Sequence, residues 1–211
     1  MDLVNYLTQI YGYNAPIFLK DIRIGRKSKS AIKEEFYRAT KRGEIVRKSN
    51  GIYYVKGNNE FGSGITFEEI IQKKYLYKDD VAIGFEELFV EGYYSGLTFL
   101  NQIGISEQVP AVLEVTTNKT SSKKRYYSSG KRIAIIRKSR TEINFQNYKI
   151  LQFLDMFYFV SMDEVKKNKE LLRTYIKDNC LTRSQFTKYI GFYGTQTIKK
   201  IVEGGIIDAF I

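Results

Sequence analysis

Histidine is absent from this chain of 211 residues, and Cys180 is its only cysteine. A single cysteine cannot form an intrachain disulfide, and without histidines the sequence excludes zinc sites and histidine-based acid–base catalysis. No run of eighteen apolar residues is present, and the N-terminus lacks a basic segment followed by an apolar core. We therefore expect a cytoplasmic protein with no membrane span, no metal site and no cofactor.

Positive charge is abundant but unevenly placed. The chain has 34 Lys and Arg against 23 Asp and Glu, a net charge of +11. Residues 20–56 hold twelve basic and four acidic side chains, and residues 119–140 hold nine basic and none acidic, whereas residues 61–118 hold three basic and nine acidic. This distribution predicts two separate basic surfaces and a polyanionic partner.

A basic amphipathic helix is predicted over residues 28–42. Ser28 or Ser30 can cap its first amides, and Gly43 ends it where a left-handed cap is cheapest. Apolar residues recur at intervals of three and four residues, which gives the helix one buried stripe. The members of this stripe are Ala31, Ile32, Phe36 and Ala39.

A β-hairpin follows this helix. Residues 44–48 alternate as a short strand, residues 52–55 form the returning strand, and Asn50-Gly51 between them is typical of a type I′ turn, in which both central residues have positive φ. Upstream, residues 2–11 have helical spacing, and Pro16 opens a further short apolar segment that we expect to be helical. Three short helices and a two-stranded wing predict a winged helix-turn-helix domain over residues 1–57.

Such a domain places its third helix in a DNA major groove, while the wing contacts the backbone or the adjacent minor groove. The local excess of basic residues favours double-stranded DNA over the alternatives, a winged module for protein contacts or a helix whose lysines form a solvated face. The candidate DNA-binding residues are Lys27, Lys29, Ser30, Lys33, Tyr37, Lys41, Arg47, Lys48 and Asn50.

Turn-forming residues 58–64 predict a linker, and two further regions follow it. Residues 65–145 are expected to form a mixed α/β domain, with helices at 67–75 and 93–103, strands at 111–117 and 132–137, and a polar, basic connection between those strands. Residues 146–211 are expected to form a small helical region, with helices at 148–159, 163–179, 182–189 and 195–203. The predicted fold class is therefore α+β.

The segment from Gly92 to Pro110, GYYSGLTFLNQIGISEQVP, followed by Thr116-Thr117-Asn118, resembles the central helix and turn of AbiEi-type antitoxins. Residues 30–31, 43–47 and 51–54 are similar to the winged-helix half of the same proteins. The resemblance covers roughly residues 1–140. AbiEi-type proteins are the antitoxins of type IV toxin-antitoxin and abortive-infection pairs.

The resemblance implies an N-terminal domain that binds repeats in its own promoter. It also implies a C-terminal region that counteracts a nucleotidyltransferase-like toxin without a stable complex. Basic surface residues of that region are the candidates for this antagonism, although a solvated hairpin loop remains the alternative for them. They are Lys123, Lys124, Arg125, Lys131 and Arg132.

Two other functions remain open from the residues alone. A stand-alone winged-helix regulator with a dimerising or ligand-sensing second domain would need the same DNA-binding half. A metal-dependent nuclease would need carboxylates followed by a lysine at fixed spacing, and that lysine is missing. We therefore expect no enzymatic activity. The carboxylates available to a nuclease would be Asp79, Asp80, Glu86, Glu87 and Glu114.

Overall fold

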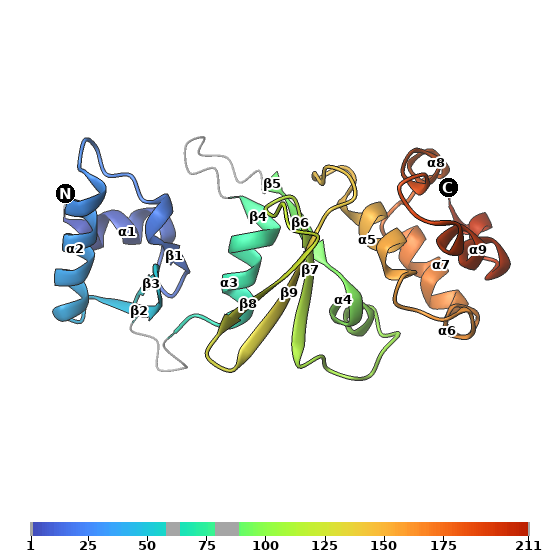
Figure 1. The fold of residues 1–211 in the computed structure, drawn as a ribbon, viewed down its shortest axis with the longest axis horizontal. Coiled ribbons are helices and arrows are strands. Elements are labelled where there is room, and N and C mark those ends of the chain that lie inside the picture. Colours follow the sequence, from blue (N-terminus) through green and yellow to red (C-terminus); the bar gives the residue numbers. More distant parts are fainter. Residues whose placement is uncertain (1, 58–63, 79–88, 211) are drawn as a thin grey trace. The chain divides into compact units, whose positions relative to one another are not determined.

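The computed structural model of the protein describes residues 2–57, 64–78 and 89–210. The chain divides into two compact units, Met1–Lys73 and Lys74–Ile211, which are described separately below. Both helices and β-sheets are present, so the predicted α+β class is confirmed (Figure 1). None of the helices in these ranges is long and apolar enough to cross a membrane.

Up to residue 57, the first unit contains two helices, a 3₁₀ turn and a three-stranded antiparallel sheet with the strand order β1-β3-β2. Asp2 caps the first helix by accepting a hydrogen bond from the amide of Val4. The elements are α1 (Leu3–Tyr11), β1 (Ile17–Phe18), the 3₁₀ turn η1 (Leu19–Asp21), α2 (Lys29–Lys41), β2 (Ile45–Ser49) and β3 (Ile52–Val55).

One hydrophobic core joins these elements. Leu7 of α1 and Phe36 and Ala39 of α2 are fully buried, and the ring of Phe36 meets that of Tyr53 edge to face at 5.0 Å between centroids. Burying a side chain such as Phe36 contributes about 1.5–3 kcal/mol. The apolar stripe that predicted α2 therefore fixes which side of this helix faces the sheet.

The second predicted helix of this unit is wrong. Ile17 and Phe18 form a strand that pairs with β3, opposite Tyr53 and Ile52, and only the single turn η1 follows it. Both residues are buried and both favour extended backbone, so sheet pairing competes successfully with a short helix. As a result the sheet has a third strand, where the sequence predicted a two-stranded wing.

The hairpin is confirmed, but its turn type is wrong. Gly51 has φ +71°, whereas Asn50 keeps a negative φ, so the pair does not form a type I′ turn. The register shifts between Arg47 and Ser49, so that Ser49 faces Ile52. A glycine in the left-handed region beside a β-bulge is an alternative way to close a hairpin, and it needs positive φ at the glycine alone.

Residues 58–63 of the predicted linker lie outside the described residues. The chain continues in α3 (Phe67–Ile71), whose first turn is held by a capping box in which Thr66 and Glu69 bond each other's backbone amides. The π-helical turn η2 (Gln72–Leu76) extends it, so the predicted helix at 67–75 is confirmed.

The second unit is built on a four-stranded mixed sheet with the strand order β6-β7-β9-β8. Strand β7 runs parallel to β9 and antiparallel to β6, and β8 forms the outer edge by antiparallel pairing with β9. The strands are β6 (Gly92–Tyr94), β7 (Val112–Thr117), β8 (Lys124–Ser129) and β9 (Arg132–Lys138), and β4 (Tyr77–Lys78) pairs separately with β5 (Phe89–Val90).

Helices complete the second unit. Helix α4 packs against β7 and α5 against β6, and their apolar residues form one core with the helices that follow. Residues on both sides of position 145, such as Phe99 and Phe153, belong to this core, so the predicted regions 65–145 and 146–211 pack together. The helices are α4 (Gly96–Gln102), α5 (Tyr148–Met156), α6 (Met162–Lys167), α7 (Lys169–Asp178), α8 (Arg183–Ile190), α9 (Thr195–Glu203) and the 3₁₀ turn η3 (Ile207–Ala209).

Three element predictions in this unit need correction. The helix expected at 93–103 begins at Gly96, and the residues before it form β6. The helix expected at 163–179 is broken at Asn168 into α6 and α7. The connection expected between the strands at 111–117 and 132–137 contains a strand of its own, β8, because its backbone pairs with β9 along six residues.

Candidate nucleic-acid interface

Helix α2 is oriented by its cap and by its apolar stripe. The hydroxyl of Ser28 accepts a hydrogen bond from the amide of Ala31 at 3.2 Å, which makes Ser28 the N-cap, and Ser30 lies within 2.9 Å of that hydroxyl. Ile32, Phe36 and Ala39 are buried against the unit. The opposite side of the helix is therefore left for solvent or a partner.

The predicted contact residues of α2 lie on that open side. They are spaced four residues apart, so they form one line along the helix surface. Tyr37 is 57 % exposed, and the ammonium group of Lys41 lies 5.6 Å from the centre of its ring. The exposed residues of this stripe are Lys29, Lys33, Tyr37 and Lys41, with Ser30 beside them.

Lys27 differs from the other predicted residues because its charge is paired. Its ammonium lies 2.5 Å from a carboxylate oxygen of Glu35, and both side chains are partly exposed. An exposed ion pair of this kind is worth at most about 1 kcal/mol, so a phosphate could compete with Glu35 for the lysine. Lys29, Lys33 and Lys48 form no ion pair with any described residue.

The hairpin turn organises the three predicted residues of the wing. The guanidinium of Arg47 donates a hydrogen bond of 3.1 Å to the side-chain oxygen of Asn50. Arg47, Lys48 and Asn50 are all exposed. The amide of Leu19 in η1 also donates to the carbonyl of Gly51 at 2.9 Å, which ties the hairpin turn to the segment that precedes α2.

Beside this hydrogen bond between Leu19 and Gly51 lies a basic hollow that the sequence analysis did not find. It has a volume of about 340 Å³ and is open to solvent. The guanidinium of Arg23 donates to the carbonyls of Lys20 and Ile22 at 2.8 Å, which fixes its position at the rim. Four cationic side chains surround the hollow together with Asn50: Lys20, Arg23, Lys29 and Lys33. The sequence analysis did not name Lys20 and Arg23 because they precede the predicted helix, although both are among the twelve basic residues of positions 20–56.

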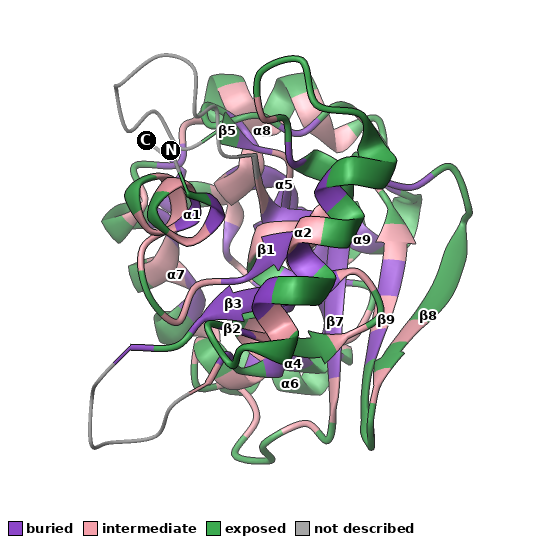
Figure 2. Ribbon diagram, turned by 90° about the vertical axis from the view of Figure 1, so that its left-hand side faces the viewer, coloured by how far each residue is buried: buried purple, intermediate pink, exposed green. Residues whose placement is uncertain are grey.

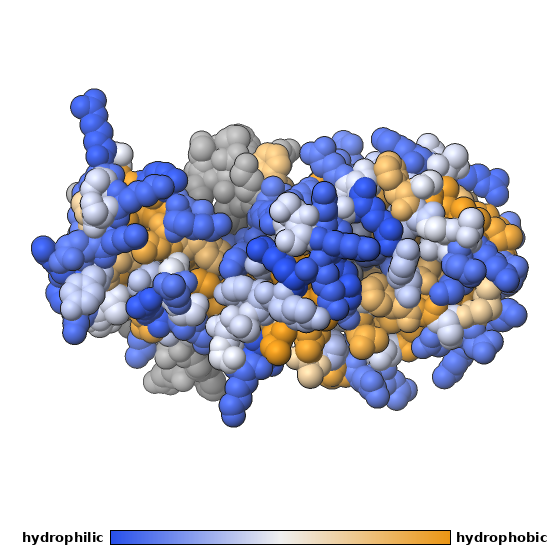
Figure 3. Space-filling view, viewed as in Figure 1, coloured by the Kyte–Doolittle hydropathy of each residue, from blue (hydrophilic) through white to orange (hydrophobic). Residues whose placement is uncertain are grey.

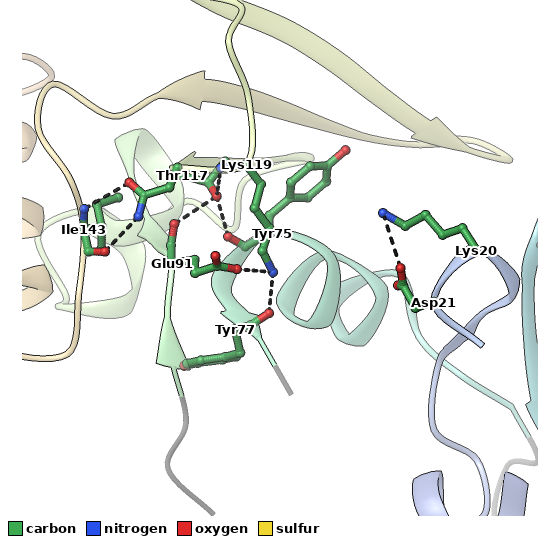
Figure 4. Close-up of polar contacts among 9 residues, drawn as sticks. Lys20, Asp21, Tyr75, Tyr77, Glu91, Thr117, Lys119 and Ile143 are labelled. Atoms are coloured by element: carbon green, nitrogen blue, oxygen red, sulfur yellow. Dashed lines mark hydrogen bonds and ion pairs between the residues drawn. The ribbon is translucent and has the colours of Figure 1, made fainter. Parts of the chain in front are cut away.

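The second basic segment, residues 119–140, divides into paired and exposed cations. Lys119 is held inward, since its ammonium donates to the carbonyl of Tyr77 at 2.6 Å and lies 2.7 Å from the carboxylate of Glu91 (Figure 4). The neighbouring Thr117 hydroxyl donates to the carbonyl of Tyr75 at 2.6 Å. These contacts anchor the end of β7 and make Lys119 a structural cation.

Arg137 and Arg140 are likewise turned toward acidic groups of the unit. Arg137 lies 2.6 Å from the carboxylate of Glu114, and Arg140 lies 3.5 Å from that of Asp155. Burial raises the pKa of Asp155, while Arg140 and a hydrogen bond from Thr116 act in the opposite direction. At least three of the nine cations of this segment are therefore paired with acidic groups among the described residues of the unit.

The structure places the five residues predicted for toxin antagonism on β8, on β9 and in the turns beside these strands. Lys123, Lys124, Lys131 and Arg132 are exposed. Arg125 is exposed as well, but its guanidinium donates to the hydroxyl of Tyr75 at 3.2 Å and lies 5.3 Å from that ring. Lys124, Arg125 and Arg132 lie in regular strands of the hairpin and not in a loop.

Of the carboxylates available to a nuclease, the structure describes Glu114. Asp79, Asp80, Glu86 and Glu87 lie outside the described residues. Glu114 is buried, and besides Arg137 its carboxylate accepts a hydrogen bond from the amide of Leu97 at 3.3 Å. Within the described ranges, no group of three acidic, cysteine or histidine side chains is arranged to hold a metal ion.

No protein-family model matches the chain, and no curated protein is significantly similar to it.

Proposed function

We propose that the first unit is a winged helix-turn-helix domain that binds double-stranded DNA. The order α1, β1, η1, α2, β2, β3 and the sheet order β1-β3-β2 support this proposal, with the turn η1 in the place of the second helix. In this arrangement α2 is the recognition helix, and the hairpin of β2 and β3 is the wing.

The observation that carries the proposal is the cationic hollow next to the exposed stripe of α2. Lys29 and Lys33 belong to both, while Lys20 and Arg23 add charge from outside the helix. Phosphate contacts supply most of the sequence-independent affinity for DNA, and a concave group of cations suits a backbone phosphate. Ser30 and Tyr37 are exposed on the same open side of the helix but do not line the hollow, and side chains in such positions can reach base edges.

We further propose that the protein acts by binding, as a transcriptional autorepressor and as the antitoxin of a type IV pair. The support is the resemblance of residues 1–140 to AbiEi-type antitoxins. On this proposal the first unit binds repeats in the protein's own promoter. The second unit counteracts a nucleotidyltransferase-like toxin without a stable complex, through the basic residues on and beside β8 and β9.

DNA binding is tested by fluorescence anisotropy with a labelled duplex from the protein's own upstream region and a scrambled duplex, over a series of salt concentrations. The test variant replaces the four cations of the hollow by alanine. The slope of log K against log salt is about −0.9 per phosphate contact, so we expect it to become shallower by up to about 3.6. A matched variant removes four exposed lysines of the second unit: Lys166, Lys167, Lys177 and Lys188.

Retention of the upstream duplex against scrambled competitor would support a specific operator. An unchanged salt slope in the hollow variant, or an equal change in the matched variant, would contradict the proposed interface. The antitoxin role has a separate test, in which a co-directional neighbouring gene is expressed with and without this protein. Growth arrest by the neighbour that this protein relieves supports the role, and a neighbour without toxicity leaves a stand-alone regulator.

A further inference from the structure

The two faces of the edge strand β8 have different surroundings. Residues alternate between the faces of a strand, and directly paired residues of neighbouring strands share a face. On one face, Arg125 and Tyr127 are paired with Ile136 and Ala134, which are fully buried. The ring of Tyr127 meets that of Tyr75 at 6.1 Å between centroids. This face of β8 is used for packing within the unit.

The other face of β8 is open. It contains Lys124 and Tyr126, and Tyr126 is paired with Ile135 of β9. Tyr126 is 66 % exposed, and Ile133, on the same face of β9, is 40 % exposed. Among the described residues of the second unit, helices α4 and α5 pack against β7 and β6, and no helix packs as closely against β8 or β9. Figure 2 shows exposed residues along most of β8, and in Figure 3 hydrophilic residues cover much of this hairpin with a small hydrophobic patch beside them.

One cation lies beside the ring of Tyr126, and two further exposed lysines lie at the ends of β8, Lys123 before it and Lys131 in the turn to β9. The ammonium of Lys124 lies 5.2 Å from the centre of the Tyr126 ring. Within the described residues, Lys123, Lys124 and Lys131 form no ion pair with a carboxylate. Because residues 119–140 contain no acidic side chain, nothing in this segment offsets the charge of these lysines. An exposed aromatic ring with a cation beside it, on a hairpin that has further exposed lysines, matches a ligand that combines flat bases with phosphates.

The sheet topology favours a single strand over a duplex. A two-stranded β-ribbon can enter a major groove when both of its edges are free. Here β9 is paired on its other side with β7 over six residues, from Ile133 opposite Val112 to Lys138 opposite Thr117. The hairpin is thus part of a wider sheet, over which an unpaired strand can lie with a base stacked on a tyrosine.

We propose that the open face of β8 and β9 binds single-stranded nucleic acid, with Tyr126 as the stacking platform and Lys123, Lys124 and Lys131 as phosphate contacts. This proposal does not depend on DNA binding by the first unit. It names the class of ligand for the basic surface to which the antitoxin proposal assigns toxin antagonism. RNA and single-stranded DNA both have the bases and phosphates that this surface would contact.

The test uses the full-length protein carrying the four alanine replacements of the hollow, so that the first unit contributes little affinity. The probes are labelled oligouridine and oligothymidine of about 12 nucleotides, close to the length that such surfaces cover, and a duplex of the same length. Tyr126→Leu keeps an apolar side chain in the strand but removes the flat ring. Tyr13→Leu is the matched control, because Tyr13 is 61 % exposed and lies in the other unit.

Loss of a base stack weakens binding by roughly 5- to 150-fold, and we expect a change of that size for Tyr126→Leu and none for Tyr13→Leu. Lys124→Ala should also make the salt dependence shallower by about 0.7. If these variants lose binding to oligouridine alone, the site is assigned to RNA. If they lose binding to both oligonucleotides equally, the site is assigned to single-stranded RNA and DNA alike. Single-strand binding that survives both Tyr126→Leu and Lys124→Ala, or tighter binding of the duplex, would overturn the proposal.

Discussion

Gly96→Ala should destabilise the second unit far more than an ordinary glycine replacement. Gly96 has φ +56° at the first residue of α4, and a methyl group there would lie 2.5 Å from the carboxylate of Glu114. The left-handed conformation alone costs a non-glycine residue about 1–2 kcal/mol. The carboxylate cannot move aside without disturbing its ion pair with Arg137 and its hydrogen bond from the amide of Leu97.

Breaking a buried ion pair costs about 3–5 kcal/mol, and since Arg137 is partly exposed we take the lower part of that range or less. Added to the conformational cost, this gives an expected loss for Gly96→Ala of up to about 5 kcal/mol. Gly104→Ala is the matched control, since Gly104 has φ +80° but no atom within 4 Å of an added methyl group. Its expected loss is only the conformational cost of about 1–2 kcal/mol.

Urea unfolding of the full chain, followed by far-UV circular dichroism, measures both losses. Hydrogen exchange at the amides of β7 assigns them to the second unit. Equal losses for the two variants would show that the close approach of Gly96 to Glu114 has no energetic consequence, and would refute the reasoning.

Two further predictions concern the helical part of the second unit. Hydrogen bonds from Ser161 lower the pKa of Glu164, so the stability that Glu164 contributes is present above its ordinary pKa near 4.5 and is lost as the pH falls through the folded value. The loss of unfolding free energy in Glu164→Gln should therefore be largest near neutral pH and should vanish in acid, and a loss independent of pH would contradict this. Lys200 donates to the carbonyls of Phe157 and Val160 at 2.8 and 2.6 Å, so Lys200→Met should cost about 1–3 kcal/mol in thermal or urea unfolding, whereas exposed Lys199→Met should cost less than 0.5 kcal/mol.

Local signals in the sequence were enough for the helices with clear caps. The bounds predicted for α9 coincide with Thr195–Glu203. Helix α2 ends at Lys41, two residues before Gly43, where the sequence predicted that it stops. In both cases the spacing of apolar residues and the terminal glycine act over a few neighbouring positions. Such elements need no information from distant parts of the chain.

The elements that the sequence did not predict depend on distant partners. Strand β8 reads KRYYSS, which has no alternation of apolar and polar residues, and it becomes a strand because β9 offers it a pairing edge. The residues before Gly96 have helical spacing but pair with β7, because the backbone turns at Gly96 to bring α4 onto Glu114.

The hollow of the first unit was missed for the same reason. Its rim residues Lys20 and Arg23 come near α2 only because Leu19 bonds to the carbonyl of Gly51, and this contact spans 32 positions of sequence. Charge counting found that the region is basic, but only the tertiary contact brings those two cations next to Lys29 and Lys33.

Net charge alone overstates what the second unit can offer to a polyanion. Of the nine cations in residues 119–140, Lys119, Arg137 and Arg140 are paired with acidic groups of the same unit, so at most six can contact a polyanion. At about 0.7 per contact with a single strand, the salt dependence from this segment cannot exceed a slope of about 4 in magnitude. Since Arg125 is also hydrogen-bonded to Tyr75, we expect a smaller slope of about 2 to 3. A measured slope well above 4, in the variant that lacks the hollow cations, would mean that the strand extends beyond β8 and β9 to basic residues elsewhere in the chain.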